Sequence, residues 1–237
     1  MKIEIACTNY LSCLNAQKVG IDRIELFENL HEGGCTPSYG IIKKVKENLT
    51  LPIYVMIRPR GGNFIYSQED IDIMKNDIQI CHELKVEGIV FGILTEEAEV
   101  NTLACKQLLS EWKFKPATFH RAFDRCADLN LSLEKIIDLG FERVLTSGGK
   151  NTAVEGKEKI KELQEQFGER IILMPGSGIT SANALEVSQF CKTTEIHATC
   201  KKENTENSTY LNSSFKDAYP VSDLTFIQNL KNAFSEF

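Results

Sequence analysis

Residues 52–60 read Pro-Ile-Tyr-Val-Met-Ile-Arg-Pro-Arg, and Gly61-Gly62 follow them. An apolar, β-type run thus ends in two arginines. The pattern returns at 115–124, Lys-Pro-Ala-Thr-Phe-His-Arg-Ala-Phe-Asp, and at 194–198, Thr-Glu-Ile-His-Ala. Apolar strands that repeatedly end in chemically capable side chains predict parallel strands with one site across their carboxyl ends.

Apolar runs of this kind begin at eight places along the chain, near residues 3, 23, 53, 89, 117, 143, 171 and 195. Their spacing of about 20 to 36 residues is the length of one βα unit, and helical patterns lie between them. We therefore predict a TIM (β/α)₈ barrel, an α/β fold, as a single domain over residues 1–237 with all eight strands within 1–200. An open, doubly wound sheet is the alternative, but no G-x-G-x-x-G turn follows the first strand.

Several helix ends are predicted from their capping residues. Asn9 and Gly20 bound the first helix, and Ser67 with Asp70 forms a capping box before the third. Thr180 or Ser181 is expected to cap the helix near 181–190. After the eighth strand, residues 201–214 are polar and predict an exposed loop, and a last amphipathic helix begins at Asp223.

Composition limits the classes of partner. The chain has 42% hydrophobic and 25% charged residues and a net charge of −6, so it lacks the basic balance of a nucleic-acid-binding surface. No apolar run approaches the roughly 20 residues of a membrane span. The first residues enter a strand directly, without a secretory hydrophobic region. We expect a cytoplasmic protein with neither a nucleic acid nor a membrane as partner.

Eight cysteines are scattered along the chain without any Cys-x-x-Cys pair. Cys13, Cys81 and Cys105 fall on the apolar faces of helical patterns, where a free cysteine acts as a small hydrophobic residue. Reduced thiols in the core are therefore favoured over a disulfide framework or a metal site.

Charged residues at the ends of the second and third strands predict an anion site. Glu25 stands within an apolar strand, where an unpaired carboxylate is costly, so it needs a cationic partner. Arg58 and Arg60 are the expected partners, and pairing with Arg23 is the alternative. The two arginines, followed by glycines, are suited to hold a carboxylate or phosphate.

Two histidines predict acid–base chemistry. His120 closes the fifth strand with Asp124 four residues later, and His197 closes the eighth. Imidazole transfers protons near neutral pH, and a neighbouring carboxylate orients it. Glu25, Arg58, His120, Asp124 and His197 are thus the candidate catalytic residues.

Glycine-rich loops after the sixth and seventh strands predict backbone nests for an anion. With Arg60, they supply the candidate binding residues, which are Ser147, Gly148, Gly149, Gly176, Ser177 and Gly178. No His-x-His pair, strand-end lysine or Gly-x-Ser-x-Gly elbow indicates a metal-dependent hydrolase, a Schiff base or a serine nucleophile.

Together these motifs resemble those of the CutC family, the copper homeostasis proteins with a TIM barrel. The segments that carry the resemblance are 22–26, 32–38, 56–62, 118–124, 143–148 and 174–176. The resemblance implies a cytoplasmic homodimer or homotetramer associated with copper handling. Relatives often have cysteine where this chain has Ala6 and Phe27, and here Cys7 is displaced by one residue. Cu(I) prefers thiolates, so copper is implied by the resemblance but not supported by the ligand spacing.

Three functions follow from these observations. The resemblance implies a role in copper homeostasis. The strand-end residues indicate instead an enzyme that performs acid–base chemistry on a small carboxylated or phosphorylated metabolite. The third is a ligand-binding barrel without turnover.

Overall fold

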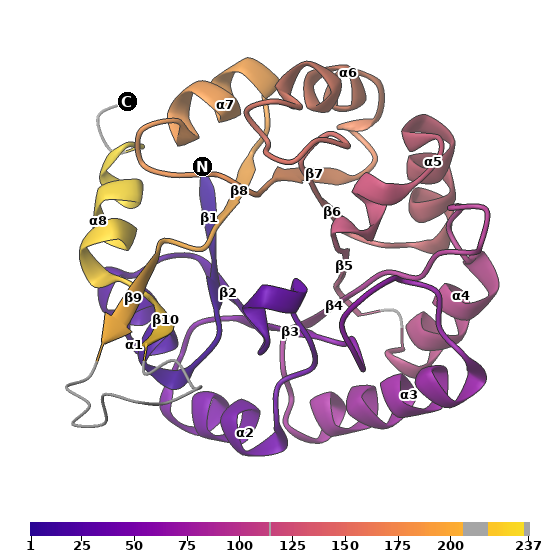
Figure 1. Ribbon diagram of the computed structural model, residues 1–237, viewed down its shortest axis with the longest axis horizontal. Coiled ribbons are helices and arrows are strands. Elements are labelled where there is room, and N and C mark those ends of the chain that lie inside the picture. Colours follow the sequence, from indigo (N-terminus) through magenta and orange to yellow (C-terminus); the bar gives the residue numbers. More distant parts are fainter. Residues whose placement is uncertain (114, 206–217, 235–237) are drawn as a thin grey trace, which may run out of the picture.

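The computed structural model describes residues 1–113, 115–205 and 218–234. Eight parallel strands form a nearly closed barrel, and helices form a ring around it (Figure 1). The hydrogen-bonded order is β7-β6-β5-β4-β3-β2-β1-β8. The strands are β1 Lys2–Cys7, β2 Arg23–Leu26, β3 Ile53–Met56, β4 Gly88–Phe91, β5 Ala117–Phe119, β6 Arg143–Thr146, β7 Ile172–Pro175 and β8 Glu195–Ala198. The predicted TIM barrel and its eight strand positions are confirmed.

The helices run between the strands as the apolar periodicity predicts. They are α1 Tyr10–Val19, α2 Tyr39–Asn48, α3 Gln68–Glu83, α4 Thr102–Glu111, α5 Leu129–Leu139, α6 Lys157–Phe167, α7 Ala184–Cys191 and α8 Leu224–Asn232. Two short 3₁₀ helices, Leu30–Glu32 and Arg121–Arg125, follow β2 and β5. Asn9 and Gly20 bound α1, Ser67 and Asp70 form the capping box of α3, and Asp223 caps α8.

One predicted cap is wrong. Asn183, not Thr180 or Ser181, precedes α7. Its side chain accepts a hydrogen bond from the Thr180 N–H and donates one to the Gly178 carbonyl, so it closes the preceding turn. Asn183 thus stabilises residues 180–183 as a turn, although the sequence predicted them as the start of the helix.

Residues 201–205, predicted as part of a polar loop, form instead a strand, β9 Lys201–Thr205, paired antiparallel with β10 Ala218–Ser222. The remainder of the predicted loop, 206–214, lies outside the described residues. Asn9 ties this hairpin to the start of α1, because its Nδ2 donates to the Pro220 carbonyl at 2.8 Å. Figure 1 shows the hairpin beside α1 and α8.

The large apolar core lies between the strands and the helices and includes Cys13, Cys81 and Cys105, as predicted. The inside of the barrel, unlike this core, contains both apolar and charged side chains. It holds a small apolar cluster around Phe27, Tyr54, Met56 and Val90, and next to it lie charged side chains. The parallel register pairs Glu4 with both Arg23 and His197. Side chains two residues apart share a face, so a charged layer lies within the barrel below its mouth.

Candidate functional site

A cavity of about 1080 Å³ opens at the carboxyl ends of the strands. Among the predicted residues that line it are Glu25, His120, Asp124, Gly149, Ser177, Gly178 and His197. Arg58, Arg60, Ser147, Gly148 and Gly176 are not among its lining residues. The structure thus brings together the predicted acid–base residues but not the predicted arginine clamp.

Glu25 is the central buried carboxyl of this cavity. It is 3% exposed, and its Oε1 has no hydrogen-bond partner among the described residues. Its Oε2 lies 3.7 Å from Nε2 of His197, so the basic partner of Glu25 comes from β8. The sequence-based expectation that Arg58 or Arg60 pairs with Glu25 is wrong. Burial raises the pKa of Glu25 to about 7, although the nearby His197 opposes the shift.

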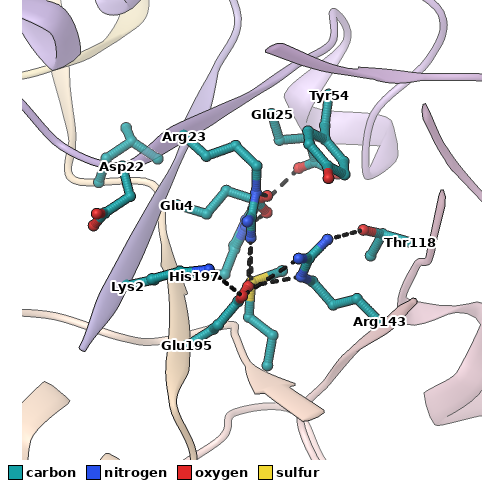
Figure 2. Close-up of polar contacts among 12 residues, drawn as sticks. Lys2, Glu4, Asp22, Arg23, Glu25, Tyr54, Thr118, Arg143, Glu195 and His197 are labelled. Atoms are coloured by element: carbon teal, nitrogen blue, oxygen red, sulfur yellow. Dashed lines mark hydrogen bonds and ion pairs between the residues drawn. The ribbon is translucent and has the colours of Figure 1, made fainter. Parts of the chain in front are cut away.

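His197 is held by a carboxylate that the sequence analysis did not select. Nδ1 of His197 lies 2.8 Å from Oε1 of Glu4, on the neighbouring strand β1 (Figure 2). Burial lowers the pKa of His197, but Glu4 and Glu25 outweigh it and the net pKa is raised. The ring thus lies between two carboxyls, with Nδ1 toward Glu4 and Nε2 toward Glu25.

Below His197, two arginines and two glutamates form the charged layer in Figure 2. Arg23 pairs with both Glu4 and Glu195, its bond to Glu195 being 2.7 Å long. Nε of Arg143 also lies 2.7 Å from Glu195. Burial raises the pKa of Glu4, but Arg23 and His197 hold it well below its usual range. The two arginines and two glutamates balance in charge, so they support the site without neutralising Glu25.

His120 faces the same cavity in the neutral form. Its Nδ1 accepts a hydrogen bond of 3.2 Å from the Ala122 N–H, so the ring proton is on Nε2. Burial, helped by the positive charge of Arg58, lowers the pKa of His120 to about 3. Nε2 is buried and lacks a partner in the described part of the chain. His120 is therefore a hydrogen-bond donor ready for a ligand.

Asp124 does not orient His120, contrary to the sequence-based expectation. Its carboxylate accepts hydrogen bonds from Arg121 Nε at 2.8 Å, from Thr146 Oγ1 at 2.6 Å and from groups of the loop after β6. Those loop donors are the Ser147 N–H, the Ser147 hydroxyl and the Gly149 N–H. The predicted nest after β6 is real, but the protein's own carboxylate fills it.

The loop after β7 keeps an open face toward the cavity. Ser177 and Gly178 have φ of 75° and 72°, the left-handed backbone of a nest, and both line the cavity. Gly176 lies deeper, and its N–H donates to the Thr146 carbonyl. The side chain of Ser177 donates to the Asn151 carbonyl at 2.8 Å. Of the two predicted nests, this one remains available to a ligand.

Arg58 and Arg60 brace loops. Arg58 is 2% exposed and donates to the carbonyls of Glu32, Gly34 and Gly62 at 2.6 to 2.9 Å. Its guanidinium also lies over the Phe64 ring. The half-exposed Arg60 donates to Asp70 and to the Ile65 carbonyl. The planar fork expected for an anion thus joins the loops after β2 and β3, so neither arginine enters the candidate site.

Within the described part of the chain, four Arg and Lys residues line the cavity, and sequence reasoning selected none of them as ligand-binding. They are Arg121, Arg125, Lys150 and Lys201. The guanidinium of Arg121 already donates hydrogen bonds to Asp124 and Ser147. The rim is therefore positive above the Glu25 carboxyl, although the net charge of the chain is −6. Such a rim attracts small anions.

The donor set fits a copper ion poorly. Within residues 1–113, 115–205 and 218–234, no three His, Cys, Asp or Glu side chains form a group that suits a metal ion. All eight cysteines are free, and six are buried. Burial and the neighbouring Cys13 thiol raise the pKa of Cys7 well above its usual range, which disfavours the thiolate that Cu(I) binds. In the same described residues, no helix is long and apolar enough to cross a membrane.

Comparison with known proteins gives consistent matches. A model of the CutC family matches residues 1–202. The human copper homeostasis protein cutC homolog is 42% identical over 90% of this chain and 78% of its own length. A CutC family protein of Histophilus somni is 44% identical over 85% of this chain and 83% of its own. The crystal structure of a CutC protein from Streptococcus agalactiae superimposes with a TM-score of 0.81 at 37% identity, over 84% of this chain and 98% of that one.

Proposed function

The chain belongs to the CutC family, and we propose that its barrel binds a small anionic metabolite and transfers a proton on it. One observation carries the proposal: two buried polar atoms without partners, Oε1 of Glu25 and Nε2 of His120, belong to residues that line the same cavity. Buried polar atoms are nearly always paired, so an unpaired acceptor and an unpaired donor in one cavity indicate a ligand.

Charge supports an anionic ligand. Arg125, Lys150 and Lys201 lie at the mouth, where they raise the local concentration of anions. The loop at Ser177 and Gly178 provides backbone geometry suited to a phosphate or carboxylate. A general base works best when its pKa is near the working pH, which is where burial places Glu25.

The experiment is a binding measurement with small anions: inorganic phosphate, malonate and 2-phosphoglycolate. Each is added to the purified protein in a thermal-shift assay and then measured by calorimetry. We expect at least one to bind, and Lys201→Glu to weaken its binding at least fivefold. Lys106→Glu, an exposed charge reversal on α4, is the matched control and leaves binding unchanged. Equal weakening by both variants, or no binding to the wild type, contradicts the proposal.

Copper handling is the second candidate function, favoured by the names of the relatives. The described donor set offers copper only dispersed and mostly buried ligands, so we expect weak binding. The test is competition of the reduced protein against a colorimetric Cu(I) chelator. Stoichiometric retention of copper that Cys7→Ser or Cys13→Ser abolishes would establish this candidate over the first.

A further inference from the structure

The two unpaired atoms belong to residues that line one cavity, and they have opposite hydrogen-bonding character. Oε1 of Glu25 accepts, whereas Nε2 of His120 carries the ring proton and donates, since Nδ1 is occupied by the Ala122 N–H. They come from β2 and from the end of β5, so they approach the cavity from different sides of the barrel. A ligand that satisfies both must present a proton to Glu25 and an oxygen to His120.

The environments of these groups separate their roles. His120 stays neutral because burial and Arg58 lower its pKa to about 3, so it donates a hydrogen bond without releasing a proton. Glu25, by contrast, has the His197 ring 3.7 Å away, held in place by Glu4. A carboxyl near its pKa that lines the same cavity as a fixed neutral donor is an arrangement suited to proton removal next to a carbonyl.

Resting on the proposed function, we infer that the site enolises a small anionic carbonyl compound, with Glu25 as the base and His120 as the donor to the carbonyl oxygen. Glu25 takes a proton from the carbon next to the carbonyl. The C–H electron pair forms the new carbon–carbon double bond, and the carbonyl π pair moves to oxygen. Nε2–H of His120 bonds that oxygen as its negative charge develops. The protonated Glu25 then returns a proton to the same carbon as the oxygen lone pair re-forms the carbonyl, so no co-reactant is consumed.

The substrate class follows from the lining of the cavity. The compound needs a carbonyl with a neighbouring C–H for the Glu25 and His120 pair. It also needs a phosphate or carboxylate for the positive rim and the loop at Ser177 and Gly178. A cavity of about 1080 Å³ exceeds what a three-carbon unit fills, so larger phosphorylated hydroxy-ketones and keto acids fit as well.

The test is proton exchange with D₂O, which needs no knowledge of the product. Dihydroxyacetone phosphate, fructose 6-phosphate and 2-oxoglutarate are incubated with the protein, and loss of the α-proton signals is followed by NMR. We expect exchange above the uncatalysed rate for at least one compound. Glu25→Gln should reduce it at least a hundredfold, and His120→Leu at least tenfold. His120→Gln, which keeps an N–H donor, should recover part of that loss.

Controls separate this inference from the function on which it rests. Asp138→Asn, exposed at the end of α5, should exchange like the wild type. Far-UV circular dichroism and thermal unfolding check that each variant folds. Saturation-transfer NMR on the same samples reports binding. Binding without exchange, or exchange unchanged in Glu25→Gln, overturns the enolisation and leaves the anion site. Absence of both binding and exchange overturns the two proposals together.

Discussion

A single side chain, Glu25, combines burial with an unpaired oxygen. Its neighbours could have neutralised it, yet Arg23 is committed to Glu4 and Glu195, and Arg58 is committed to backbone carbonyls. Among the residues that the structure describes, the basic group that remains for Glu25 is His197, whose Nε2 lies 3.7 Å from the carboxylate, beyond hydrogen-bond distance. A buried carboxylate left this way costs stability, and such strain is retained where a site uses it.

This cost predicts a pH-dependent stability. Because burial raises the pKa of Glu25 from 4.5 to about 7, the protonated form stabilises the fold, and this stability is lost as pH rises through about 7. Glu25→Gln mimics the protonated form. We therefore expect it to raise the free energy of unfolding by about 1–3 kcal/mol at pH 8 and to have little effect at pH 4.5. Urea denaturation at both pH values measures this, with the exposed Glu134→Gln as control. A difference that does not grow with pH would contradict the burial argument.

At the scale of elements, the loops at the mouth are held by side chains that the sequence suggested for ligand binding. Arg58 joins the loops after β2 and β3, and Asp124 fills the nest after β6. The side chain of Asp124 is 4% exposed and accepts from several donors, so it acts as a fixed internal anion. Its role is to give the loop one conformation beside the cavity.

Asp124→Asn should therefore destabilise the fold. The amide keeps one acceptor but turns an NH₂ toward donors such as the Ser147 N–H and Arg121, which leaves buried groups unpaired. We expect a loss of about 2–3 kcal/mol in the free energy of unfolding. Chemical denaturation checks it against Asp138→Asn, whose carboxylate is exposed. If both variants match the wild type within about 0.5 kcal/mol, Asp124 is free for a ligand after all.

Part of the fold and of the candidate site could be predicted from the sequence. Strand starts, the caps of α1, α3 and α8, and the convergence of Glu25, His120 and His197 at one end all follow from local patterns. The ion-pair and hydrogen-bond partners of these residues could not be predicted, because spacing along the chain does not say which strands face each other across a barrel. Glu4 and Arg143 were missed as site supports. The available signal was alternation: Arg23 with Glu25, and Glu195 with His197, are two residues apart and share the inward face.

Across the whole molecule, the charged layer joins strands that are distant along the sheet. The hydrogen-bonded order ends at β7 on one side and β8 on the other. Glu195 on β8 binds Arg23 on β2 and Arg143 on β6, and its ion pair with Arg143 crosses that seam inside the barrel. The layer thus helps to close the barrel and places His197 beneath the cavity.

Removing one residue of the charged layer should destabilise the fold. Arg143→Met leaves Glu195 with a weaker set of buried partners, and we expect a loss of about 3 kcal/mol in the free energy of unfolding. Adding Glu195→Gln to the same chain should recover part of that loss, because the layer then no longer holds an excess negative charge. If the free energy of unfolding of Arg143→Met lies within about 1 kcal/mol of the wild-type value, the layer does not support the barrel.

The central claim is that one cavity of the barrel is lined by a carboxyl near its pKa and by a neutral imidazole donor. NMR titration of protein labelled with ¹³C in Glu and ¹⁵N in His tests it directly, with Glu25→Gln and His120→Gln assigning the signals. We predict that the Glu25 carboxyl titrates near pH 7, and that His120 stays neutral from pH 5 to 9 with its proton on Nε2. A Glu25 midpoint near 4.5 together with a His120 midpoint near 6.5 would contradict the account.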